Sequence, residues 1–117
     1  MSTIIRCGGG YQDLDEMVQE ASIAVNTNAS SADISAGEKG FLIFIVTGPS
    51  STLNDPTASG TVNFKQVSKV DCGGNVGMQS HEVSSVTVFD GGANGGTIEF
   101  SGNNVWTRVM RKITQKQ

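Results

Sequence analysis

The sequence has little of what most catalytic, metal-binding and nucleic-acid-binding domains depend on. Its 117 residues include one histidine, two cysteines, two prolines and eight lysines and arginines, and only 16% of the residues are charged. Two thiols and one imidazole at unrelated spacings are too few for a tetrahedral structural metal site. Eight basic residues at a net charge of −3 provide no basic face for phosphate contacts. We therefore expect no metal, no cofactor and no nucleic-acid partner.

Signals for export and for membrane insertion are also missing. Residues 1–6 lack a basic leader followed by a long apolar run. The apolar run 41–46 is far shorter than the roughly 20 residues that a helix needs to cross a bilayer. We expect no signal peptide, no transmembrane segment and folding in a cytoplasm. Free thiols are then the favoured state of Cys7 and Cys72, with a disulfide between them as the alternative.

What the sequence does contain is typical of a turn-rich β protein. Glycine, serine, threonine and asparagine are abundant, and 37% of the residues are hydrophobic. Residues 40–48 place seven β-branched, aromatic or aliphatic residues between two glycines, which predicts a central strand that is buried on both faces. A chain of this length can bury a core of its own, so we expect one domain.

Further strands are predicted after this central one. Residues 60–70 alternate until Val67 falls out of phase, which indicates a bulge near Gln66. Residues 83–90 and 97–101 form two strands, joined by the glycine-rich stretch 91–96 as a flexible hairpin tip. In the last strand, the valines and isoleucine are expected to face the core. The alternate residues are expected to face solvent or a partner: Trp106, Arg108, Met110 and Lys112.

One helix is expected, over residues 13–25. Asp13 and Glu16 resemble a capping box, and apolar residues recur on one face. Their spacing also fits a short coiled-coil seam that would bring copies of the chain together, although a helix packed on its own sheet is favoured. A competing interpretation makes residues 22–27 a strand. The seam would be formed by Leu14, Val18, Ala21 and Val25.

These elements predict a mainly β fold, an antiparallel β-sandwich or jelly-roll-like barrel with one short N-terminal helix. Residues 1–12 would be an arm or edge strand and residues 13–25 the helix. Residues 26–39 would be a linker with Ile34 as its one apolar anchor, and residues 40–114 the sandwich. All belong to a single domain, 1–117.

No residue pattern indicates catalysis, and we expect a non-enzymatic protein. His81 has no nucleophile-elbow motif near it, and the carboxylates that could hydrolyse sugars fall on separate strands. The loop 48–60, which holds both prolines, is the favoured binding segment because long loops in compact domains are often functional. The candidate binding residues are Ser50, Ser51, Thr52, Asn54, Asp55, Asn94 and Trp106.

Charge of opposite sign is segregated along the chain. Half of the basic residues lie in the last ten positions, whereas the N-terminal third is acidic. The basic residues either protect a solvated sheet edge or meet the acidic segment of another copy. In the second case Arg108, Arg111 and Lys112 join the helix seam as assembly contacts, and the protein is a homo-oligomer.

The closing strand of residues 104–113, the possible seam and the long polar loops together resemble a small virion protein of a tailed bacteriophage. Tail-fibre heads, receptor-binding domains and head decoration proteins share this make-up. The resemblance implies a structural or receptor-binding role in the virion, with other virion proteins or a host-surface glycan as partners. The alternative is a carbohydrate-binding β-sandwich module, against which stands an aromatic content of only 6%.

Overall fold

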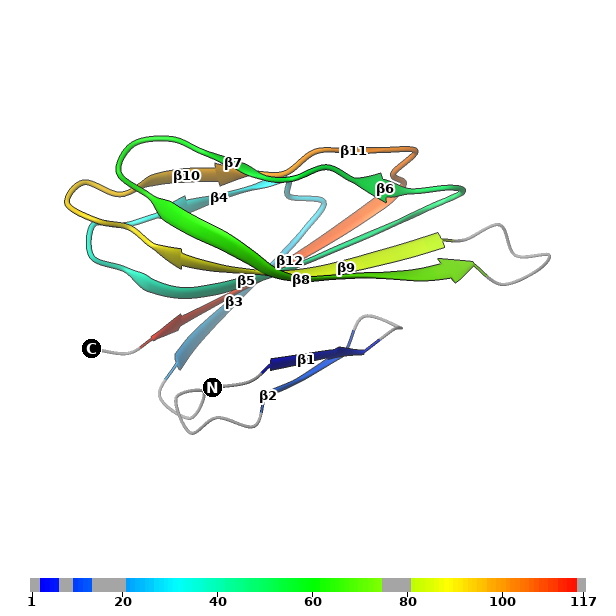
Figure 1. Cartoon of the computed structure of the whole chain (residues 1–117), viewed down its shortest axis with the longest axis horizontal. Helices are drawn as coiled ribbons and strands as arrows, with labels where there is room; N and C mark the ends of the chain where they lie inside the picture. The colour runs from blue at the N-terminus through cyan, green and yellow to red at the C-terminus, as the bar shows by residue number, and fades with distance from the viewer. Residues whose placement is uncertain (1–2, 7–9, 14–20, 75–80, 116–117) are drawn as a thin grey trace.

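The computed structural model describes residues 3–6, 10–13, 21–74 and 81–115, which form strands in antiparallel sheets and no helix (Figure 1). The expected mainly β, antiparallel fold is confirmed. The largest sheet has five strands in the order β3-β12-β5-β9-β8. These are β3 (Ala21–Thr27), β12 (Thr107–Gln115), β5 (Lys39–Gly48), β9 (His81–Asp90) and β8 (Asn63–Gly74).

Two smaller sheets lie over one face of the five-stranded sheet (Figure 1). One has the order β4-β10-β7, with β4 (Ser31–Ile34), β10 (Gly96–Glu99) and β7 (Thr57–Ala58). The other pairs β11 (Gly102–Asn103) with β6 (Thr52–Leu53). The backbone N–H of Asn54 donates to the carbonyl of Ser101 at 2.9 Å, which links the two small sheets into one upper layer.

The fourth sheet lies on the opposite side of the five-stranded sheet. It is the hairpin of β1 (Thr3–Arg6) and β2 (Gly10–Asp13), which pair only with each other, and β1 contacts β9 (Figure 1).

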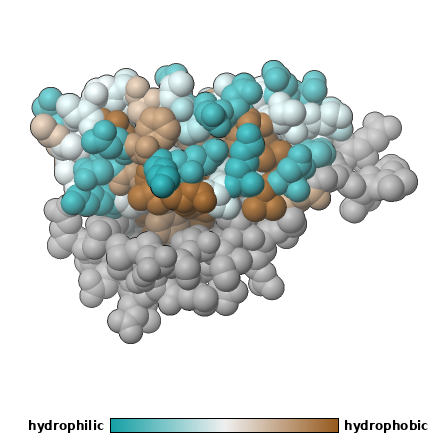
Figure 2. Space-filling model, in the orientation of Figure 1, coloured by the Kyte–Doolittle hydropathy of each residue, from teal (hydrophilic) through white to brown (hydrophobic). Residues whose placement is uncertain are grey.

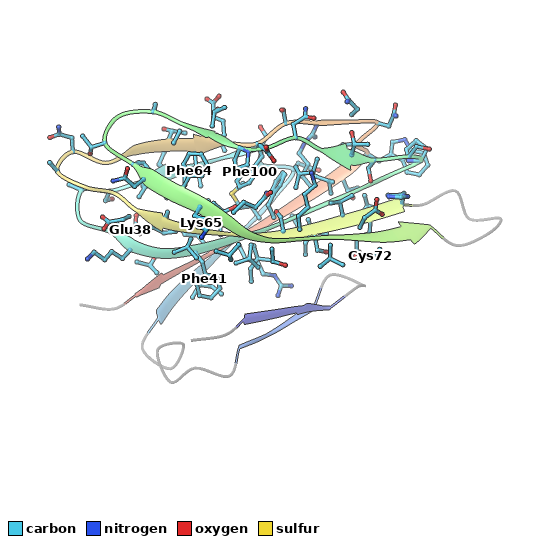
Figure 3. All side chains as sticks on the ribbon, viewed as in Figure 1. Glu38, Phe41, Phe64, Lys65, Cys72 and Phe100 are labelled. Atoms are coloured by element: carbon cyan, nitrogen blue, oxygen red, sulfur yellow. The ribbon has the colours of Figure 1, made fainter. Side chains whose placement is uncertain are left out.

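Strand β5 supplies both hydrophobic cores, because its side chains alternate between the two faces of the sheet. Leu42, Phe44 and Val46 face the upper layer, where the rings of Phe44 and Phe100 stack with centroids 4.5 Å apart. Phe41, Ile43 and Ile45 lie on the other face with Val86 and Ile113. Figure 3 shows Phe100 between the layers and Phe41 below the large sheet. The prediction that this strand is buried on both faces is confirmed.

The expected helix is wrong over its C-terminal part. Residues 21–27 are strand β3, which pairs with β12 in a register that sets Val25 opposite Arg111 and Ala21 opposite Gln115. The competing interpretation of residues 22–27 as a strand is correct. Pairing along β12 outweighs a helical spacing of only two heptads, because helix propensity is a weak preference that tertiary contacts override. Ala21 and Val25 therefore cannot form a helical seam. Leu14 and Val18 lie outside the described residues.

Two of the expected loops are part of the folded layers. The stretch 26–39, expected to be a linker, contains β4, whose Ala32 and Ile34 are buried in the core between the layers. Ile34 is thus an anchor, as predicted, but on a strand. The stretch 91–96 is not a hairpin tip, because β9 belongs to the large sheet and β10 to the upper layer. It crosses from one layer to the other.

Strand β12 lies between β3 and β5 and is not a sheet edge. The predicted alternation is present, but the face assignment is wrong for Met110, which is 1% exposed and lies in the core between the layers. Ile113 is buried on the opposite face, as predicted. The error arises because both faces of this strand are covered. The bulge predicted near Gln66 is confirmed by a register shift between Gln66 and Ser68.

Cys72 is disulfide-bonded, so the favoured free thiol is wrong at this position. It lies in the second irregularity of β8, between Asp71 and Gly73. The other cysteine of the sequence, Cys7, lies outside the described residues. Within the described part of the chain, no helix has the length and apolar character needed to cross a bilayer.

Candidate functional site

Asp71, His81 and Ser51 lie close together but do not form a catalytic centre. Oδ1 of Asp71 on β8 lies 2.6 Å from Nε2 of His81 on β9, so the two side chains meet across neighbouring strands. Ser51, however, is 1% exposed and donates its hydroxyl hydrogen bond to the backbone carbonyl of His81 at 2.5 Å. A serine nucleophile needs the imidazole within reach of its oxygen, so these three residues are not a triad. The described ranges contain no group of three or more histidine, cysteine or acidic side chains that could hold a metal ion.

The glycine-rich loop 91–96 is held by hydrogen bonds and is not a flexible tip. Its backbone N–H groups are used inside the protein: Gly92 donates to Asp90 Oδ1, Asn94 to Thr61 Oγ1 and Gly95 to the Gly91 carbonyl. Thr61 Oγ1 also donates to the Gly91 carbonyl at 2.8 Å. Since these three N–H groups are already paired, they are not offered to a phosphate group.

The seven candidate binding residues are not brought together as one site. Asn94 lies in loop 91–96, and strand β9 separates this loop from the other end of the molecule by about 30 Å, at 3.3 Å per residue. Ser51 is buried, whereas Asn54 and Asp55 are exposed between β6 and β7. The remaining three, Ser50, Thr52 and Trp106, are exposed.

These three lie on two chain segments that connect the layers at the end of the molecule where β6 and β11 lie (Figure 1). We call residues 48–53 and 102–107 the connector ribbon. Leu53 pairs with Gly102 and Thr52 with Asn103, and the N–H of Trp106 donates to the Thr47 carbonyl at 2.8 Å. The two segments are therefore paired at the end near β6 and β11, and Trp106 is bonded to the residue that precedes the first segment.

Two glycines permit this close approach. A Cβ atom at Gly48 would overlap the carbonyl oxygen of Asn104, and one at Gly102 would overlap the carbonyl oxygen of Thr52. Lys69 on β8 strengthens the same region from below, because its Nζ donates to the Leu53 carbonyl at 2.6 Å. The two segments of the ribbon are thus closely packed, backbone against backbone, at Gly48 and at Gly102.

The outward side of the ribbon combines one large aromatic ring with small polar groups. Trp106 is 60% exposed, the largest value among the exposed large hydrophobic residues of the described part of the chain. It follows Val105, which packs against the core, and Asn104, whose φ of 56° turns the chain sharply. The other exposed residues of the ribbon are Pro49, Ser50, Thr52, Asn103, Asn104 and Thr107. None of these side chains is ionisable.

Lys112, which was expected to contact another copy, forms an ion pair and a hydrogen bond within its own chain. Lys112 Nζ lies 2.8 Å from Glu38 Oε1 and donates to the Asp33 carbonyl at 2.9 Å. Glu38 also accepts hydrogen bonds from the N–H of Ser35 and the hydroxyl of Thr114, both at 2.9 Å. The basic end of the sequence thus meets the acidic part of the same copy. Arg108 and Arg111 are half-buried on the same interior strand, so none of the three basic residues protects a sheet edge.

Electrostatics favour the ionised form of Glu38. Burial by itself would raise the pKa of this carboxyl, but the hydrogen bonds from Lys112, Ser35 and Thr114 and the positive charge of Lys112 outweigh it. The pKa of Glu38 is therefore lowered. We call Glu38, Lys112, Ser35 and Thr114 the Glu38 cluster, and it joins the turn between β4 and β5 to β12. Figure 3 shows Glu38 at the end of the molecule away from the connector ribbon.

Sequence reasoning missed Asn103, Asn104 and the Glu38 cluster. The available signals were Gly48 and Gly102, which could have indicated a close backbone approach, and the charges of Glu38 and Lys112. No family model, curated protein sequence or solved structure matches this chain. The chemistry of the connector ribbon is therefore the main guide to function.

Proposed function

We propose that the protein is a non-enzymatic structural or receptor-binding component of a tailed-bacteriophage virion. The make-up of the sequence supports this proposal through its resemblance to small virion proteins. We infer that the two strand layers form an antiparallel β-sandwich that acts as a stiff platform. On this platform the connector ribbon is the contact surface, and the chain is used in several copies.

The observation that carries the proposal is the display of Trp106 on a fixed backbone. Most of the surface of this tryptophan is in water, and tryptophan is enriched at binding surfaces. Here the segment that carries the ring is paired with its neighbour and anchored by Val105. Such a preformed surface loses little conformational freedom on binding.

The disulfide at Cys72 fits the same role. Disulfides persist in oxidising surroundings, which include the surfaces of virions and cells, and are rare in a reducing cytoplasm. A virion protein is made in the host cytoplasm and works outside the cell, where the cross-link would be retained.

Two measurements test the proposal. The first is the mass in solution by size-exclusion chromatography with light scattering, at low and high salt. The second is the binding of fluorescently labelled protein to a panel of bacterial cells. We expect a stable oligomer, saturable binding to some of the strains, or both. A salt-independent monomer that binds none of the cells would contradict the proposal.

A carbohydrate-binding module is the second candidate, and one observation favours it. Most of the phenylalanines are buried, among them Phe41, Phe44, Phe89 and Phe100, but Trp106 is exposed. A low aromatic content therefore does not prevent one ring from stacking on a sugar. This candidate differs from the first because it requires neither a particle nor other copies of the chain.

A further inference from the structure

We propose that the connector ribbon binds a neutral pyranose sugar, with the ring of Trp106 as the stacking surface. This inference rests on the proposed receptor-binding role and specifies the ligand class for that surface. The exposed residues of the ribbon are Pro49, Ser50, Thr52, Asn103, Asn104, Trp106 and Thr107.

The backbone that carries the aromatic ring is held in place before any ligand arrives. Trp106 stands between Val105, which packs against the core, and Thr107, the first residue of β12. The backbone N–H of Trp106 donates to the Thr47 carbonyl at 2.8 Å. Because the backbone on both sides of the ring is held, stacking a sugar on it orders few additional torsions.

The ribbon that carries the ring also exposes polar groups of the kind that recognise sugar hydroxyls. Asn103 and Asn104 each offer an amide oxygen as acceptor and an amide NH₂ as donor, and Ser50 and Thr52 offer hydroxyls that both donate and accept. The apolar faces of pyranose rings suit a flat aromatic side chain, while polar groups at its margin fix orientation. Since none of these four residues is charged, the ligand favoured by the ribbon is a neutral sugar.

A protein partner fits the ribbon less well. Stable protein interfaces bury about 800 Å² on each partner and centre on several aromatic or aliphatic residues. Among the residues whose exposure the structure describes, the other exposed large hydrophobic ones are Phe64, Val67 and Val88, which belong to β8 and β9 and not to the ribbon. Figure 2 shows apolar surface interspersed with polar side chains on the side of the molecule that it displays. Trp106 is the one large hydrophobic residue that the ribbon exposes.

The sequence offers a direct reporter, because Trp106 is its one tryptophan. We would titrate the protein separately with cellohexaose, maltohexaose, mannohexaose and chitohexaose and follow tryptophan emission and its quenching by iodide. We expect at least one of these sugars to shift the emission to the blue and to protect the ring from iodide, with saturation. Isothermal titration calorimetry with the same sugar would give the dissociation constant.

Three variants locate the site. Trp106→Ala should weaken binding of that sugar about tenfold or more, as expected for loss of a stacking ring, while Trp106→Tyr should retain much of it. Asn104→Gly keeps the left-handed turn, removes the amide and should weaken binding roughly threefold. Phe64→Ala is the matched control, since it removes an exposed aromatic ring from β8 and should leave binding unchanged.

The possible outcomes distinguish failure of the sugar-binding inference from failure of the proposed receptor-binding role. If none of the four sugars alters the emission or releases heat at millimolar concentration, the sugar assignment is wrong. It is also wrong if Trp106→Ala binds as tightly as the parent, or if Trp106→Ala abolishes capture of a protein receptor from the cell surface instead. In that last case the receptor-binding role stands. Cell binding that is unchanged in Trp106→Ala would place the receptor site elsewhere on the molecule.

Discussion

Replacing Glu38 by glutamine tests how the upper layer is fastened to the large sheet. The substitution keeps the shape of the side chain and removes its charge. In the folded protein the carboxylate accepts from Lys112, Ser35 and Thr114. The side chains of Glu38 and Lys112 are only 15% and 22% exposed, so water screens the pair weakly. Glutamine can accept only through its one oxygen, and its NH₂ group would face a donor.

We expect Glu38→Gln to lower the free energy of unfolding by about 2 kcal/mol at pH 7. Hydrogen bonds to a charged group contribute roughly 1.5–3 kcal/mol, and the substitution also leaves the Lys112 ammonium half-buried without its counter-charge. For a domain of this size, that loss corresponds to a fall in melting temperature of about 10 °C.

The effect should depend on pH in a definite direction. The pKa of Glu38 is lowered in the folded protein, so the carboxylate contributes stability that is fully present above the unfolded pKa of about 4.3. That contribution is lost as the pH falls through the folded pKa. The stability difference between the parent and Glu38→Gln should therefore be constant near neutrality and should shrink below about pH 4.

Urea denaturation of both proteins between pH 3 and pH 8 measures this difference. Lys39→Gln is the matched control, because Lys39 pairs with Asp90 at 3.8 Å through side chains that are 60% and 46% exposed. Such a surface pair contributes about 0–1 kcal/mol, so the control should change stability little. The reasoning fails if Glu38→Gln costs no more than Lys39→Gln at pH 7, or if its cost is the same at pH 3.

Three further substitutions test other contacts. Gly48→Ala should destabilise the fold by about 1–3 kcal/mol in urea denaturation, because its Cβ would overlap the Asn104 carbonyl; an unchanged midpoint would show that the ribbon is not closely packed. Thr61→Val should cost about 1–3 kcal/mol and speed amide exchange at Asn94, and unaltered exchange would contradict the role of its hydroxyl. Cys72→Ser should cost about 4 kcal/mol if the cross-link closes a loop of about 65 residues through Cys7. Thiol titration of the unfolded, unreduced protein should accordingly detect no free thiol.

The sequence predicted the fold best where a local pattern coincides with the tertiary environment. Residues 41–46 are apolar at every position, as expected of a strand covered on both faces. In β12, by contrast, Val109 and Ile113 alternate with Met110 and Lys112, and either set could have faced a core. Met110 is buried because a second layer covers its side, a fact that no local pattern contains.

Residues 21–25 show how the helix prediction failed. Ala21 and Val25 are four positions apart, which suits a helix, while Ile23 and Val25 are two apart, which suits a strand. Whether these residues form a helix or a strand depends on whether they can pair with β12, which lies about 85 positions further along the chain. A pairing of such long range cannot be inferred from the hydrophobic spacing of five residues.

Only part of the connector ribbon was predicted from the sequence, again because its two segments meet through long-range pairing. Ser50 and Thr52 were expected in a binding loop, and Trp106 was expected to face a partner, but Asn103 and Asn104 attracted no attention beside them. The two segments are about 50 positions apart and meet only because Leu53 pairs with Gly102 and Thr52 with Asn103. Gly48 and Gly102 carry the signal for this meeting, since each lies where a second backbone leaves no space for a Cβ atom. A glycine at the end of one predicted strand and another near the start of a distant one therefore deserve to be considered as a pair when a binding surface is sought.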